Sequence, residues 1–262
     1  MTRQEIDFGL FGPESRAWHL HKEPALLIGG LRALMLQALH PLAIAAVEQH
    51  SDYKNDVWGR FNRTSDYVMT TVFGTTDQAL ALGNRVRAIH RRIRGVDSVT
   101  GLPYSADDPV LLLWIHTTLV ESFALAYERF VRPLGVAEKD GYTGEMVRQA
   151  ELVGLLADDV PRSWAENHRF IASCRPMLQR TRTSVEALDT VLNPPLPAHR
   201  RPGWWALGQA AISLLPDDAV GLYGIRRRPL AEAAVRPVLA SMAGSHIQSW
   251  GAAQVRRPIS FA

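Results

Sequence analysis

Two long apolar runs dominate this sequence, and each contains ionisable residues near its middle. The first, ALLIGGLRALMLQALHPLAIAAV (residues 25–47), carries Arg32. The second, PVLLLWIHTTLVESFALAY (residues 109–127), carries His116 and Glu121. Charged groups are costly at the centre of a bilayer. The runs are therefore predicted to be buried helices of a soluble protein without a transmembrane segment, with a membrane-associated form as the alternative.

Helix boundary signals are frequent in the sequence, whereas strand signals are scarce. Thr75 followed by Gln78 matches a capping box. Asp108 and Pro109 suit the N-cap and the first turn of a helix, and Pro41 should break a helix near its position. No Asn-Gly or Asp-Gly turn lies between alternating runs. The pattern predicts an all-α fold.

The 262 residues are predicted to form one domain, a bundle of many helices packed around a central apolar run. The proline-rich stretch NPPLPAHRRPG (residues 193–203) is expected to be a linker inside the domain.

Composition excludes several classes of protein. The net charge of +3 is too small for a nucleic-acid reader, so we expect no nucleic-acid partner. The single cysteine, Cys174, excludes an internal disulfide and a cysteine-rich metal site. No C-x-x-C-H motif for covalent haem attachment and no signal-peptide pattern are visible, so a cytoplasmic protein is expected.

One predicted helix, residues 75–94, carries a histidine beside an apolar stripe. At about 100° per residue, the stripe consists of Ala79, Leu82, Val86, Ile89 and Ile93. His90 lies at its edge, and Gly83, Arg87 and Arg94 continue along the same flank.

This flank has two interpretations. Haem b needs a neutral imidazole for its iron, room for a flat macrocycle and cations for its two carboxylates. His90 could supply the imidazole, and Gly83 the room for the macrocycle. Arg87 and Arg94 could supply the cations. Otherwise, His90 is a half-buried packing residue, and the arginines form a solvated helix face.

Five segments of the sequence, taken in order, resemble one known family. They are MLQALHPLAIAAVEQHS (35–51), WGRFNRTSDYVMTTVFG (58–74), RVRAIHRRIRG (85–95), LLWIHTTLVESF (112–123) and LLPDDAVGLYGI (214–225). The chain resembles the latex clearing proteins (rubber oxygenases) and the MpaB-type oxygenases. The resemblance implies an all-helical domain with its core between about residues 25 and 230, arranged around a buried haem-type pocket. It also implies non-covalent haem b, and oxidation of an apolar, isoprenoid or otherwise unsaturated small molecule by dioxygen.

The resemblance also implies roles for individual residues. His90 matches the proximal iron ligand, and Arg60, Arg63 and Thr64 match the arginine–threonine segment on the distal side. Where the latex clearing protein has a lysine, this chain has Arg63, which does not lose its proton and cannot ligate iron. Arg63 is expected to bond an oxygen ligand or a haem propionate. This difference puts rubber cleavage in doubt.

His116 leaves two functional classes open. It falls in an apolar helix face, where it is either a satisfied core histidine or a second haem ligand. A second ligand would indicate a haem sensor or carrier without turnover, and a third alternative is a haem-free helical binding protein. Trp204 and Trp205 are candidates for core packing, a lid or a dimer contact, so a homodimer is also left open.

Overall fold

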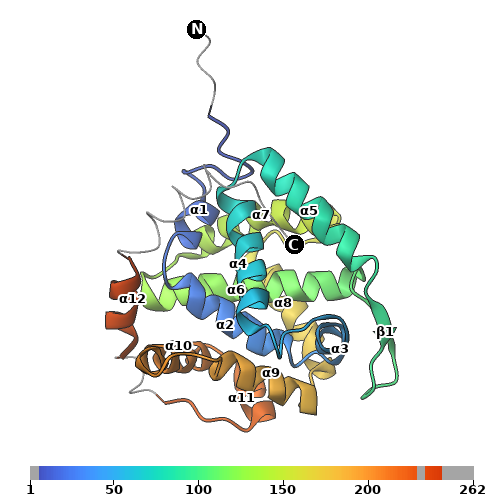
Figure 1. Cartoon of the computed structure of the whole chain (residues 1–262). Coiled ribbons are helices and arrows are strands. Elements are labelled where there is room, and N and C mark those ends of the chain that lie inside the picture. Colours follow the sequence, from blue (N-terminus) through green and yellow to red (C-terminus); the bar gives the residue numbers. More distant parts are fainter. Residues whose placement is uncertain (1–5, 229–233, 244–262) are drawn as a thin grey trace.

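The computed structural model describes residues 6–228 and 234–243, which form α-helices and one short hairpin (Figure 1). The all-α class predicted from the sequence is confirmed. The elements are α1 (Arg16–His21), α2 (Leu26–Gln37), α3 (Pro41–His50), α4 (Val57–Phe73), α5 (Thr76–His90), β1 (Arg94–Val96), β2 (Pro103–Ser105), α6 (Pro109–Phe130), α7 (Val136–Val153), α8 (Trp164–Cys174), α9 (Arg182–Leu192), α10 (Arg201–Ser213), α11 (Asp217–Tyr223) and α12 (Val235–Ala243), with short 3-10 turns at Ala157–Asp159, Arg175–Met177 and Ala198–Arg200.

Helix α6 crosses the middle of the molecule, with α5 and α7 above it and α9, α10 and α11 below it (Figure 1). It is long and apolar enough to span a membrane, but 72% of its most apolar window is buried inside the protein. The α2–α3 pair passes the same test and is bent by 102° at its break. Within the described residues, both runs are therefore built into the core, as predicted.

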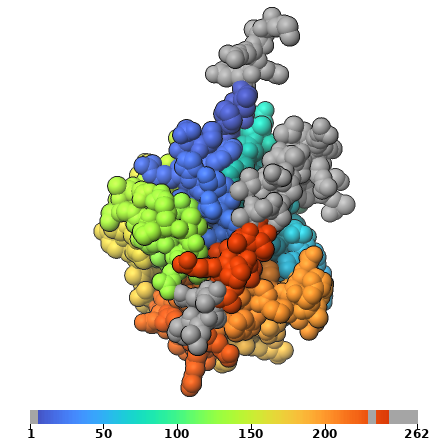
Figure 2. All heavy atoms as spheres, turned by 90° about the vertical axis from the view of Figure 1, so that its left-hand side faces the viewer, coloured from blue at the N-terminus to red at the C-terminus, as the bar shows by residue number. Residues whose placement is uncertain are grey.

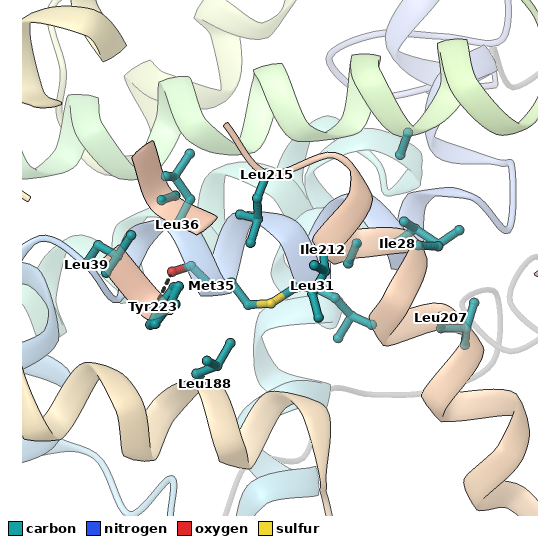
Figure 3. Close-up of a cluster of buried hydrophobic side chains, with 14 of the residues drawn as sticks. Ile28, Leu31, Met35, Leu36, Leu39, Leu188, Leu207, Ile212, Leu215 and Tyr223 are labelled. Atoms are coloured by element: carbon teal, nitrogen blue, oxygen red, sulfur yellow. Dashed lines mark hydrogen bonds between the residues drawn. The ribbon is translucent and has the colours of Figure 1, made fainter. Parts of the chain in front are cut away.

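Apolar clusters pack on both sides of α6. The larger one joins α2, α9, α10 and α11, and Figure 3 shows Met35, Leu36, Ile212 and Leu215 at its centre. The Tyr223 hydroxyl donates a hydrogen bond to the Met35 carbonyl at 2.6 Å. The second cluster joins α1, α4, α6 and α7. In Figure 2, α12 lies near the centre of the face turned to the viewer, and it contacts α10.

The charged residues of the two apolar runs form an ion pair with each other. Arg32 donates to the Glu121 carboxylate at 2.6 Å, and the two side chains are only 2% and 4% exposed. Arg32 also donates to the Ser122 hydroxyl at 2.6 Å and to the Leu214 carbonyl at 2.7 Å. Burial alone would raise the pKa of Glu121, but a hydrogen bond from His168 and the charge of Arg32 hold it below its usual range. This pair ties α2 to α6.

The predicted helix starts are confirmed, but one predicted helix end is wrong. The Thr75–Gln78 capping box is present, and Asp108 caps α6 at Pro109. The helix expected over residues 75–94 stops at His90. A turn follows, and the chain enters β1 at Arg94. The linker expected over residues 193–203 is also shorter, since α10 already begins at Arg201.

The β1–β2 hairpin has no counterpart in the sequence prediction. Its strands are three residues long, and Gly95 pairs with Tyr104. Its loop is closed by Asp97, whose carboxylate accepts from the Thr100 amide at 2.8 Å and the Thr100 hydroxyl at 2.6 Å. Gly101 adopts φ +70°, which favours glycine. Strands this short carry too few residues to show, in the sequence, the alternation of apolar and polar side chains that is typical of a strand.

Breaking the buried ion pair should destabilise the fold strongly. Glu121→Leu leaves the Arg32 charge buried without its carboxylate and should cost about 3–5 kcal/mol. Adding Arg32→Met should recover part of this loss, with a coupling of about 1–3 kcal/mol in a urea-unfolding double-mutant cycle. Asp158→Ala removes an exposed partner of Arg162 and should change stability little. Strictly additive effects of the Arg32 and Glu121 substitutions would contradict this account.

Candidate functional site

One face of α4 carries polar residues at helical spacing. Arg60, Thr64, Tyr67 and Thr71 follow at intervals of four, three and four residues, which places them on one side of the helix. At the inner end, the Gln149 side chain of α7 donates to the Thr71 hydroxyl at 2.7 Å. The Tyr67 hydroxyl donates to the Gln149 carbonyl at 3.4 Å. This face of α4 is therefore turned toward α7.

Arg60 and Tyr67 lie on this face and differ in exposure. Arg60 is exposed, although the surrounding protein and the charge of Arg63 lower its pKa. Tyr67 is half-buried, and burial raises its pKa well above its usual range. We call the surface of α4 that carries Arg60, Thr64, Tyr67 and Thr71 the α4 face.

His90 is the last residue of α5 and is electrostatically coupled to Arg60. Burial lowers the pKa of His90, the charge of Arg60 lowers it further, and Asp107 partly opposes both. Its Nδ1 is buried and has no hydrogen-bond partner among the described residues. At neutral pH, His90 is thus a neutral imidazole, the form that ligates metal ions.

The structure corrects the expectation that Gly83 leaves room for a flat group. A Cβ atom at Gly83 would lie 2.9 Å from the Leu152 carbonyl oxygen and 3.0 Å from the Leu152 Cβ. The space beside Gly83 is therefore filled by α7. Gly83 allows α5 and α7 to approach closely and does not line a cofactor pocket.

The other predicted arginines lie in different settings. Arg87 donates to the Asn84 side chain and lies against Gly154 at the end of α7. Arg94 begins β1, is 67% exposed, and lies 3.6 Å from the Asp107 carboxylate, so it does not continue the helical flank of His90. Arg63 is half-exposed and donates to Asp56 at 3.1 Å.

Arg60 differs from these three arginines in its contacts. No carboxylate lies within 4 Å of its guanidinium in the described part of the chain, and its charge acts on His90. The hydroxyl of Thr64 donates to the Arg60 carbonyl at 3.1 Å, so it is engaged with its own helix. Arg60 is therefore the cation best placed to accept an anionic ligand near His90.

His116 lies on the face of α6 that is turned toward α4 and α7. It falls between Leu112, which packs against α7, and Val120, which packs with Val68 of α4. Its ring is 5% exposed, and burial lowers its pKa to about 4. Its Nε2 has no hydrogen-bond partner among the described residues. His116 is thus a buried, neutral imidazole on the side of α6 that is turned toward α4 and α7.

Tyr67 was missed as a site residue by the sequence analysis. Its spacing from Arg60 and Thr64 was the signal that could have revealed it.

The described residues contain no group of three or more His, Cys, Asp and Glu side chains that could hold a metal ion. A pocket of about 340 Å³ opens elsewhere, between α9, α10 and the residues after α11, and none of the predicted site residues lines it.

Comparison with known proteins gives one match. The protein-family model described as "ER-bound oxygenase mpaB/B'/Rubber oxygenase, catalytic domain" matches residues 17–244. No curated protein and no solved structure matches the chain.

The coupling between Arg60 and His90 can be measured directly in the protein without added ligand. Arg60→Met removes a positive charge that disfavours the imidazolium, so the pKa of His90 should rise by a few tenths of a unit to about one unit. NMR titration of the His90 ring protons measures this shift. Arg63→Met is the matched control and should have a smaller effect, because Asp56 already neutralises Arg63. A larger shift in the control variant would place Arg63, not Arg60, beside His90.

Proposed function

The chain belongs to the family of ER-bound oxygenase mpaB/B' and rubber oxygenase catalytic domains, and from this premise we propose that it is a haem b-dependent oxygenase. Its substrate would be an apolar small molecule with an unsaturated chain, such as an isoprenoid, and its co-substrate would be dioxygen. The family indicates an oxygenase-type role, while haem and substrate are our proposals.

The neutral imidazole of His90, with its unpartnered ring nitrogen, is the main support for the haem assignment. A haem iron needs a neutral imidazole whose ring nitrogen is not already engaged. The lowered pKa of His90 keeps it neutral, and its buried Nδ1 lacks a partner among the described residues. A ligand that bonds to this nitrogen would account for the unsatisfied atom, because buried polar atoms are normally bonded.

Arg60 would hold a haem propionate. The propionates are carboxylates, and an arginine without a carboxylate partner is the cation that binds them best, by charge-assisted hydrogen bonds. Arg60 is exposed, so a bound carboxylate could reach its guanidinium. Haem, when bound, would supply the oxygen chemistry, and the protein would orient it and exclude water.

Arg63 and Tyr67 would act on the polar groups of the bound molecules. Arg63 cannot ligate iron, and its bond to Asp56 holds it at the start of α4. To reach a polar group of a bound molecule, it would have to leave Asp56. Tyr67 stays protonated, because its pKa is raised, and its hydroxyl would have to leave the Gln149 carbonyl, 3.4 Å away, to donate to a bound molecule.

Replacing His90 tests the haem assignment. We expect the wild-type protein to bind haem b with a Soret band, and His90→Ala to weaken binding by about 100-fold or more, since even groups outside the coordination sphere are worth 10–100-fold. His50→Ala is the matched control, because His50 also ends a helix but contacts the Arg94 carbonyl. Equal haem affinity in the His90 variant would refute the ligand assignment. A wild-type protein without a Soret band in excess haem would favour a haem-free binding protein.

A non-catalytic haem sensor or carrier is the second candidate, and His116 is the observation that favours it. Its buried, unpartnered Nε2 could serve as a second ligand to the iron of a bound haem. If His116 holds the iron together with His90, the ferrous protein should resist carbon monoxide, and His116→Ala should speed carbon monoxide binding about tenfold or more. His40→Ala, which removes another buried histidine, is the control. Rapid binding in the wild type, unchanged in His116→Ala, would support the oxygenase.

A further inference from the structure

The β1–β2 hairpin presents apolar side chains to solvent. Figure 1 shows it reaching away from the helices at the edge of the molecule. Val96, Val99 and Leu102 are 56%, 55% and 54% exposed, although they lie within one short stretch of chain. We call these three residues the hairpin tip. Exposed apolar groups that gather in one place mark interaction sites more often than isolated ones do.

The hairpin has one face fixed to the protein and one face free. Tyr104 is buried, and its hydroxyl donates to the Gln49 side chain at 2.8 Å. Gln49 in turn donates to the Val96 carbonyl at 3.0 Å. Because side chains alternate along a strand, Val96 and its partner Pro103 point away from the face that carries Tyr104. The end of α3 thus anchors the hairpin and leaves its outer face uncovered.

The loop at the hairpin tip is held in one shape by its own hydrogen bonds. Asp97 accepts two bonds from Thr100, and the Asp97 amide donates to the Leu102 carbonyl at 2.9 Å. The Gly101 amide donates to the Asp97 carbonyl at 2.9 Å. Val99 and Leu102 are therefore displayed by a preformed loop, and inserting them into another medium would cost little conformational entropy.

Positive charge surrounds the base of the hairpin. Arg91 and Arg92 are exposed, and neither has a carboxylate within 4 Å in the part of the chain that the structure describes. The nearby acids are already engaged: Asp97 closes the loop, Asp107 lies beside Arg94, and Asp108 caps α6. The charge of Arg91 also reaches Asp107. Arg91 and Arg92 are thus exposed cations at the base of the hairpin that contact no carboxylate among the described residues.

We propose that the hairpin tip docks the protein peripherally on an anionic membrane surface, with Val96, Val99 and Leu102 in the acyl boundary and Arg91 and Arg92 against lipid phosphates. Apolar insertion combined with basic residues at headgroup level is how proteins bind the interface without spanning it. A second copy of the chain is a poorer occupant. Three side chains fall well short of the roughly 800 Å² per partner of a stable interface, and two arginine rims would repel each other.

Co-sedimentation of the full chain with lipid vesicles tests this proposal. We expect binding to vesicles of equal parts phosphatidylcholine and phosphatidylglycerol, little binding to phosphatidylcholine alone, and weakening by salt. The double substitution Val99→Asp and Leu102→Asp should abolish binding. Arg91→Gln and Arg92→Gln should each weaken it about fivefold. None of these side chains is buried, so the fold should persist.

Val136→Asp is the matched control, because Val136 is 74% exposed and follows the opposite end of α6 from the hairpin. It should leave vesicle binding unchanged. Leu102→Cys labelled with a polarity-sensitive dye should shift to the blue only with the mixed vesicles, and Cys174, being buried, should not take up the dye.

Three results would overturn the proposal. The first is no binding of the wild type to mixed vesicles. The second is equal loss of binding in the hairpin variant and in Val136→Asp. The third is a wild-type dimer in light scattering that the hairpin variant breaks, which would make a second copy the occupant.

Discussion

The buried ion pair between Arg32 and Glu121 is the constraint on which the rest of the fold depends. Two charges leave water, and their desolvation is compensated only when nearly every polar atom is bonded. Arg32 uses three nitrogens, for the Leu214 carbonyl, Ser122 and Glu121. A shift of α2 along α6 would break several of these bonds at once. The pair therefore sets the register of the two central helices, which apolar packing alone defines less sharply.

The α4 face lies on the opposite side of α6 from the large apolar cluster. Val68 shares the second cluster with Val120 of α6, and Gln149 of α7 bonds to Tyr67 and Thr71. The outer part of α4 lies beyond these contacts, and Arg60 has no carboxylate partner among the described residues. The inner end of α4 is thus fixed by α6 and α7, while its outer end carries a cation without a counterion.

Local sequence signals predicted local structure well, and distant pairings escaped them. Capping residues and prolines marked the starts of α3, α5 and α6, because these signals act within a few residues. The charges inside the apolar runs indicated burial, but Arg32 and Glu121 lie 89 residues apart, so their pairing could not be inferred. The end of α5 was missed because Ile93 continues the apolar spacing. In the folded protein, Ile93 packs with Ala45 and Leu111, and its carbonyl accepts from the Ala106 amide.

Gly83 gains a different importance from its contact with α7. A helix behaves as a stiff rod over this length, and His90 lies about two turns beyond Gly83. Any side chain at position 83 would meet the Leu152 backbone, which cannot yield as a flexible side-chain end can. The rod would then have to shift, and the imidazole at its end would change its position relative to Arg60. The close approach at Gly83 thus helps to fix where α5 places its terminal imidazole.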